Sequence, residues 1–273
     1  MRTGGIALLW GPPRSGTTWL YNVVREVTAC ANIRAEGWVQ GQPPPDPRQF
    51  DALVVKSHQA HAVETLHGMM PHPHIHLVGI FRDPTQAFAS LIRTQSVPRD
   101  ELLTWLTRDI ESIDSAFAQL PGALLVREEW IATRAAEVIH ALASHLNAGL
   151  SPVQCTAIAH QYSRDNVNAA ISDLSRHFGW SGTFTEYDPD SHWHANHIAP
   201  KDHPQLTVTA QESAELERLA MIVDRLTVRH SILNDAADAD IRMMPIPISH
   251  QFLRATTDRP RRRLRLPQAL LRR

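Results

Sequence analysis

The sequence predicts an α/β protein with a central parallel sheet and helices on both of its faces. Four short apolar runs lack the alternation of half-exposed strands, and segments with helical spacing separate them. Strands that are apolar throughout are typical of parallel sheets buried on both faces, and helices are the usual crossovers between parallel strands. The second half of the chain has apolar residues mainly at helical spacing, so we expect it to be helical.

The first apolar run, residues 6–10, leads into the segment Gly11-Pro12-Pro13-Arg14-Ser15-Gly16-Thr17-Thr18-Trp19, which opens a helical pattern. A glycine loop between a buried strand and a helix directs backbone N–H groups and a helix N-terminus at one place, which favours an anion. The spacing is that of a Walker A loop, but Thr17 stands at the lysine position of that motif. The segment therefore predicts a phosphate site for a ligand other than an ordinary nucleoside triphosphate.

The next elements follow the same order of strand and helix. Further strands are expected at residues 53–55, 75–81 and 123–126, with a helix at 99–119. After residue 81, Asp83 as N-cap and Pro84 as the first helical residue predict the start of another helix. Residues 36–48, rich in Gly, Gln and Pro, are expected to form a loop without regular structure.

The ends of three predicted strands carry basic side chains. Arg14 lies in the glycine loop, Lys56 and His58 follow the second strand, and Arg82 follows the third. Ligands of open parallel sheets bind outside the carboxyl ends of the strands, so we expect these side chains to converge at one edge.

The rest of the chain is expected to be helical up to a basic tail. Helical spacing predicts helices at residues 134–147, 151–160 and 209–234, and Thr209 with Glu212 forms a capping box for the last of them. We expect a single domain over residues 1–253 and a solvated basic tail over 254–273.

Composition narrows the class of protein. The 273 residues carry a formal net charge of −1, which argues against a general nucleic-acid binder, and 43% are hydrophobic, enough for a buried core. The two cysteines, Cys30 and Cys155, are expected to be buried free thiols. We expect no signal peptide and no transmembrane segment, and therefore a cytoplasmic protein.

The motifs resemble those of the sulfotransferases that use 3′-phosphoadenosine 5′-phosphosulfate (PAPS). Residues 13–19 resemble the loop that holds the 5′-phosphosulfate in that family. Arg82 and, eight residues later, Ser90 resemble its 3′-phosphate motif, and Lys56-Ser57-His58 is similar to the Lys-Thr-His element of the cytosolic branch. The three elements occur in the family's order, within residues 6–95.

The resemblance implies that PAPS gives its sulfuryl group to a hydroxyl of a small molecule or saccharide and leaves as 3′-phosphoadenosine 5′-phosphate (PAP). It implies His58 as the catalytic base, Lys56 on the transferring sulfonate and Arg14 on the leaving phosphate. Trp19 is expected to stack on adenine, and no metal is implied. The donor-binding residues are expected to be Arg14, Ser15, Gly16, Thr17, Thr18, Trp19, Arg82, Ser90, Ser163 and Lys201.

Three elements of the family are incomplete in this chain. Its Tyr-Glu-Asp element is Arg127-Glu128-Glu129 here, so the tyrosine contact is missing. No Arg-Lys-Gly clamp for the 3′-phosphate is found, and Lys201 or His197 could take its place. Thr207-Val208 with Glu212 resembles half of the cytosolic dimerisation motif, which leaves a homodimer open.

Sixteen histidines raise the question of a metal site. His72, His74 and His76 alternate along a strand, and residues 192–197 hold three more, but no closed set of four ligands is visible. We therefore expect no metal and place the 192–197 cluster at the acceptor pocket, with segments 36–48 and 180–200 as its walls.

Two other functions remain open from the sequence. A small-molecule kinase of the same fold class would use ATP and magnesium, and the absent Walker lysine counts against it. A noncatalytic nucleotide-binding protein would keep only the donor site, and the presence of both Lys56 and His58 counts against it.

Overall fold

The structure is a computed structural model of the whole chain, and most residues between 5 and 233 are described. The described residues are 5–39, 42–43, 45–46, 49–58, 66, 74–120, 122–179, 187–188, 190–194 and 207–233. The predicted basic tail, residues 254–273, lies outside them, as do His72, His197 and Lys201.

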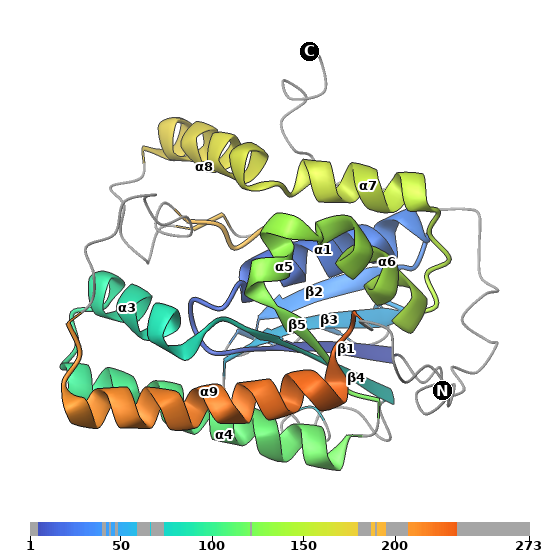
Figure 1. Cartoon of the computed structure of the whole chain (residues 1–273). Helices are drawn as coiled ribbons and strands as arrows, with labels where there is room; N and C mark the ends of the chain where they lie inside the picture. Colours follow the sequence, from blue (N-terminus) through green and yellow to red (C-terminus); the bar gives the residue numbers. More distant parts are fainter. Residues whose placement is uncertain are drawn as a thin grey trace.

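Within the described residues, a five-stranded parallel sheet forms the centre of the molecule (Figure 1), with strand order β2-β3-β1-β4-β5. The strands are β1 (Gly5–Trp10), β2 (Ala35–Val39), β3 (Ala52–Ser57), β4 (His74–Phe81) and β5 (Leu124–Arg127). The predicted fold class and the four predicted strands are confirmed.

Helices cover both faces of this sheet, as predicted. One face carries α1 (Thr17–Cys30), α5 (Glu128–Thr133), α6 (Ala135–His145), α7 (Pro152–Gln161) and α8 (Arg164–Phe178), and the other carries α3 (Pro84–Thr94), α4 (Arg99–Gln119) and α9 (Ala210–His230). Figure 1 shows the two helical layers with the sheet between them.

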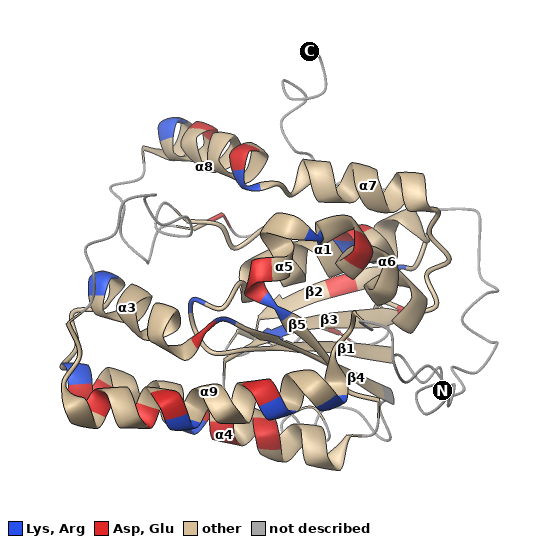
Figure 2. Cartoon of the chain, viewed as in Figure 1, with Lys and Arg blue, Asp and Glu red and all other residues tan. Residues whose placement is uncertain are grey.

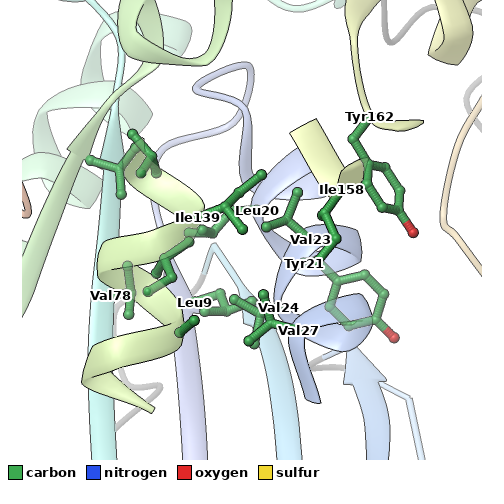
Figure 3. Packing of buried hydrophobic residues seen from close by; sticks show 14 of the residues in the cluster. Leu9, Leu20, Tyr21, Val23, Val24, Val27, Val78, Ile139, Ile158 and Tyr162 are labelled. Atoms are coloured by element: carbon green, nitrogen blue, oxygen red, sulfur yellow. The ribbon is translucent and has the colours of Figure 1, made fainter. Parts of the chain in front are cut away.

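The hydrophobic core consists of two clusters, one on each face of the sheet. Successive residues of β1 alternate between them: Leu8 packs with α3, α4 and α9, whereas Leu9 packs with α1 and α6. Figure 3 shows the second cluster, which includes Leu20 and Val24 of α1 and Ile139 of α6. Burying one such aliphatic side chain contributes about 1.5–3 kcal/mol, so both faces of the strands stabilise the sheet.

The segment 36–48 is a correction to the sequence prediction, because its first residues form the edge strand β2 instead of a loop. Ala35–Val39 pairs with β3 in parallel register, and the ring of Trp38 is buried in the core. The prolines begin only at residue 43, and Trp38 and Val39 both favour strands. The proline-rich composition that predicts a loop therefore describes only the later residues of the segment, and residues 36–39 belong to the strand.

Helix boundaries largely follow the predicted ones. The helix at 99–119 is confirmed at both ends, and the capping box of Thr209 with Glu212 begins α9 as expected. The helices α5 and α8 were not predicted. Both cysteines are free thiols, but Cys30 is only half-buried.

The sheet topology selects one place for a ligand. The chain leaves β1 for α1 on one face of the sheet, whereas it leaves the neighbouring strand β4 for α3 on the other face. Open parallel sheets bind ligands where adjacent connections diverge in this way, outside the carboxyl ends of the strands. The glycine loop after β1 and the loop after β4 lie at that point.

Candidate active site at the carboxyl edge of the sheet

The loop between β1 and α1 is shaped by two glycines. A Cβ at Gly11 would lie 2.3 Å from the carbonyl oxygen of Ile80 on β4, so only glycine lets the loop approach that strand. Gly16 precedes α1 with φ of 91°, a left-handed conformation that glycine adopts at little cost. Ser15 between them is buried, and its hydroxyl has no hydrogen-bond partner among the described residues.

Arg14 extends from this loop to α3. Its own backbone is left-handed, with φ of 71°, and its Nε donates to the hydroxyl of Ser90 at 3.0 Å. Burial, and then the nearby charges of Arg82 and Arg93, lower the pKa of Arg14 to about 10. The guanidinium stays charged at neutral pH, and crowding by other cations favours an anion beside it.

Lys56 lies at the end of β3 with its ammonium buried against α1. Its Nζ donates to the hydroxyl of Thr18 at 2.7 Å, and only 8% of the residue is exposed. Burial, and then the charge of Arg14, lower the pKa of Lys56 to about 8. A buried ammonium that lies beside another cation is a strong site for an anion.

His58 follows β3 and is held in one orientation by the loop. Its Nδ1 lies 2.7 Å from the carbonyl oxygen of Gly11, and its Nε2 lies 3.4 Å from the hydroxyl of Thr17. A carbonyl oxygen only accepts hydrogen bonds, so Nδ1 carries the proton and Nε2 keeps its lone pair. Burial, and then the charge of Lys56, lower the pKa of His58 to about 4.

Arg82 lies just before the N-cap of α3, and Ser90 lies in the middle of that helix. Asp83 caps this helix by accepting from the backbone N–H of Gln86 at 2.9 Å, as the sequence predicted. The Nε of Arg82 donates to the side chain of Gln86 at 3.2 Å. Ser90 is fully buried, and its hydroxyl accepts the hydrogen bond from Arg14.

The expected adenosine-contacting residues lie beside the junction of α7 and α8. The indole N–H of Trp19 donates to the carbonyl oxygen of Tyr162 at 3.0 Å, and Trp19 is half-buried against the core. Ser163 is the N-cap of α8 and accepts from the backbone N–H of Asn166. The structure thus brings Trp19 and Ser163 to the same junction, although they are distant in sequence.

Part of the 192–197 histidine cluster lies near this site. The carbonyl oxygen of Ser191 accepts from the side chain of Asn22 on α1, and the ring of His192 contacts Tyr21 edge-on. Burial, and then the charges of Arg14 and Lys56, lower the pKa of His194 to about 4. The segment therefore lies within electrostatic reach of the cations at the strand ends.

Several polar residues of the site were not predicted from the sequence. Gln86, Arg93 and Asn22 each lie three or four positions from a predicted residue on the same helix, the spacing that places two side chains on one helix face. That spacing is the sequence signal that could have found them. Burial, and then the charge of Arg82, lower the pKa of Arg93, so it belongs to the same group of cations.

The residues that replace the Tyr-Glu-Asp element have different partners. Arg127 contacts Glu129 at 2.9 Å and Asp224 of α9 at 3.0 Å, so its side chain is directed to α9. Glu128 lies 3.8 Å from Arg82. Figure 2 shows basic residues on the loops after β1 and β4, with acidic residues at the start of α5.

The described residues show neither a metal-binding cluster nor a helix that could span a membrane. Within the part of the chain that is described, no group of three or more His, Cys, Asp or Glu side chains is arranged to hold a metal ion. The described helices include none whose length and apolar character suit a transmembrane span.

Comparison with known proteins identifies the fold. No protein-family profile matches the sequence, and no curated protein sequence matches it. Among solved structures, the chain resembles mouse sulfotransferase SULT7A1 complexed with PAP, with a TM-score of 0.52. The chain has the sulfotransferase fold. The likeness covers 80% of this chain and 83% of the mouse sulfotransferase at 12% sequence identity.

Proposed function

We propose that this protein is a sulfotransferase that transfers a sulfuryl group from PAPS to a hydroxyl of a small-molecule or saccharide acceptor and releases PAP. The observation that carries the proposal is the convergence of Arg14, Lys56, His58 and Arg82 where β1, β3 and β4 end. This combination offers anion sites and a base in one place. The sulfotransferase fold is consistent with this assignment.

The residues fit a donor with negative charge at two ends. The glycine loop and the start of α1 supply backbone N–H groups, and the unpartnered hydroxyl of Ser15 adds a further donor, for the 5′-phosphosulfate. Arg82, Ser90 and the start of α3 supply the second site, for the 3′-phosphate. The hydrogen bond from Arg14 to Ser90 joins the two sites through one side chain.

The cations stabilise charge that moves during transfer. The bond between sulfur and the bridging phosphate oxygen breaks while a bond forms between sulfur and the acceptor oxygen. Lys56, buried and fixed by Thr18, neutralises the sulfonate oxygens, and Arg14 hydrogen-bonds to the phosphate oxygen that gains charge. Arg14 remains protonated at neutral pH, so it acts by charge and hydrogen bonding.

His58 receives the proton of the acceptor hydroxyl at Nε2. Its hydrogen bond to Gly11 leaves that nitrogen with the lone pair, and its low pKa keeps it unprotonated at neutral pH. A nearby negative charge favours the protonated form of an imidazole, so a bound donor anion raises the pKa of His58 toward the range useful for a base. The proton then leaves the site with solvent after the sulfated product departs.

Ligand-dependent thermal stability tests this proposal. The melting temperature is measured with PAP, with ADP and with ATP plus magnesium, each over a range of concentrations. A ligand at 100 times its Kd stabilises by about 2.7 kcal/mol, which corresponds to a shift of roughly 5–10 °C for a chain of this size. We expect PAP to give the largest shift, because it alone of the three nucleotides carries a phosphate at both the 3′ and the 5′ position.

Stabilisation by ATP with magnesium but not by PAP would contradict the proposal and favour a small-molecule kinase. Stabilisation by PAP without transfer of labelled sulfuryl to any member of a phenol, alcohol and saccharide panel would favour a noncatalytic nucleotide-binding protein.

A further inference from the structure

Glu128 is an acidic residue beside the cations of the candidate site. It begins α5 directly after β5, and the last residue of β5 pairs with Phe81, which precedes Arg82. This register brings one Oε atom of Glu128 to 3.8 Å from the Nε of Arg82. The contact therefore follows from sheet pairing.

The stem of Glu128 also lies beside the glycine loop. A Cβ built on Gly16 would be 3.6 Å from the Cγ of Glu128, which is ordinary van der Waals contact. The carboxylate is thus next to Arg82 while its stem borders the loop after β1. The negative charge therefore lies at Arg82, in the proposed 3′-phosphate half of the donor site, and the apolar stem faces the loop.

The geometry argues against a role in holding Arg82 in place. At 3.8 Å the distance exceeds that of a hydrogen bond, whereas Gln86 accepts from the same Nε at 3.2 Å. What Glu128 contributes to Arg82 is therefore mainly charge. Its neighbour Glu129 is directed to Arg127 instead, at 2.9 Å.

We propose that Glu128 is a fixed countercharge that weakens binding of the 3′-phosphate at Arg82 and so sets the affinity for the donor and its bisphosphate product. This inference rests on the proposed sulfotransferase function. The 3′-phosphate is unchanged by the reaction, so the carboxylate opposes donor and product alike. Product release is often rate-limiting in enzymes, and a residue that weakens this contact favours release.

The size of the effect follows from exposure. About a third of the Glu128 side chain and a fifth of that of Arg82 are exposed, so water and salt screen the interaction. We expect removal of the charge to tighten PAP binding roughly three- to tenfold at low ionic strength. The gain shrinks as salt is added, because screening reduces the repulsion that was removed.

Calorimetric titration of Glu128→Gln and wild type with PAP and with 5′-AMP tests the inference. Glutamine keeps the size of the side chain, and 5′-AMP lacks the 3′-phosphate. Glu129→Gln is the matched control, since it removes the adjacent carboxylate from the same helix start. We expect tighter PAP binding only in Glu128→Gln, little change for 5′-AMP, and a smaller gain at 0.5 M than at 0.05 M salt.

An unchanged or weaker PAP affinity in Glu128→Gln overturns the inference and leaves the sulfotransferase proposal standing, provided that wild type binds PAP. An equal gain for 5′-AMP, an equal gain in Glu129→Gln, or a gain that does not depend on salt also overturns it. Absence of PAP binding to wild type removes the proposed function, and this inference with it.

Discussion

The imidazole of His58 shows how one backbone contact sets the chemistry of a side chain. Gly11 accepts from Nδ1, and the same glycine permits the loop to approach β4. A larger residue at position 11 would displace the carbonyl that fixes the tautomer of His58. The shape of the loop and the basicity of Nε2 are therefore linked through a single residue.

His58→Asn is expected to lower turnover about 10²- to 10⁴-fold while PAP affinity changes little. The asparagine amide can still donate to the carbonyl oxygen of Gly11, as Nδ1 does, but nothing replaces Nε2 as a base. Steady-state transfer to an acceptor and PAP titration measure the two effects separately. His140→Asn is the control, because His140 is exposed on α6. Wild-type turnover in His58→Asn would exclude His58 as the base.

At the residue scale, the sequence predicts which side chains follow the strands, but it does not predict the contacts that depend on which strands pair. Arg14, Lys56 and Arg82 are predictable because parallel strands all end at one edge. Glu128 also follows a strand, but its contact with Arg82 could not be predicted, because that contact depends on β5 lying beside β4. The left-handed backbone of Arg14 is also invisible in the sequence, since only the fold imposes it.

Among the elements, α3 matters most for the proposed second phosphate site. It begins beside Arg82, carries Ser90 in its interior, and depends on Asp83 to satisfy one of its first backbone N–H groups. Loss of such a cap typically costs about 1 kcal/mol and frays the first turn. A frayed first turn would release Gln86, which orients Arg82.

Asp83→Ala is expected to lower the free energy of unfolding by about 1 kcal/mol relative to Asp83→Asn, a shift in melting temperature of roughly 2–4 °C. Both variants remove the negative charge, but only asparagine keeps an acceptor for the helix N–H. We also expect weaker PAP binding in Asp83→Ala than in Asp83→Asn. Equal stability and equal PAP affinity in the two variants would show that the cap does not support the site.

Elements were predictable where local pattern and tertiary environment agree. The helix at 99–119 has acidic residues in its first turn and a regular apolar face, and its ends are correct. The edge strand β2 was missed because it is short and lies next to a proline-rich segment. The helix α8 was missed although Val167, Ala170 and Ile171 have the spacing of one helix face, because most of its other residues are polar and exposed.

Across the whole molecule, histidines with lowered pKa lie at both edges of the sheet. His58 and His194 belong to the carboxyl edge, whereas His145 at the end of α6 contacts His76 near the start of β4, with ring centroids 5.1 Å apart. Burial, and then the charge of His76, lower the pKa of His145 to about 4. An unfolded histidine has a pKa near 6.5, so the unfolded chain binds more protons between these values.

Stability is therefore expected to fall as pH is lowered from about 6.5 toward about 4, because protonation favours the unfolded state in that window. His145→Phe should reduce the number of protons taken up on unfolding by close to one and so make this fall shallower. Phenylalanine keeps an aromatic ring against His76 and cannot titrate. Urea unfolding at half-unit steps of pH measures the slope, and the exposed His140→Phe serves as control. An acid slope in His145→Phe equal to that of wild type would show that His145 is protonated as readily in the folded chain as in the unfolded one. The fall in stability at acid pH would then come from the histidines at the carboxyl edge. In that case bound PAP should change how steeply the free energy of unfolding depends on pH.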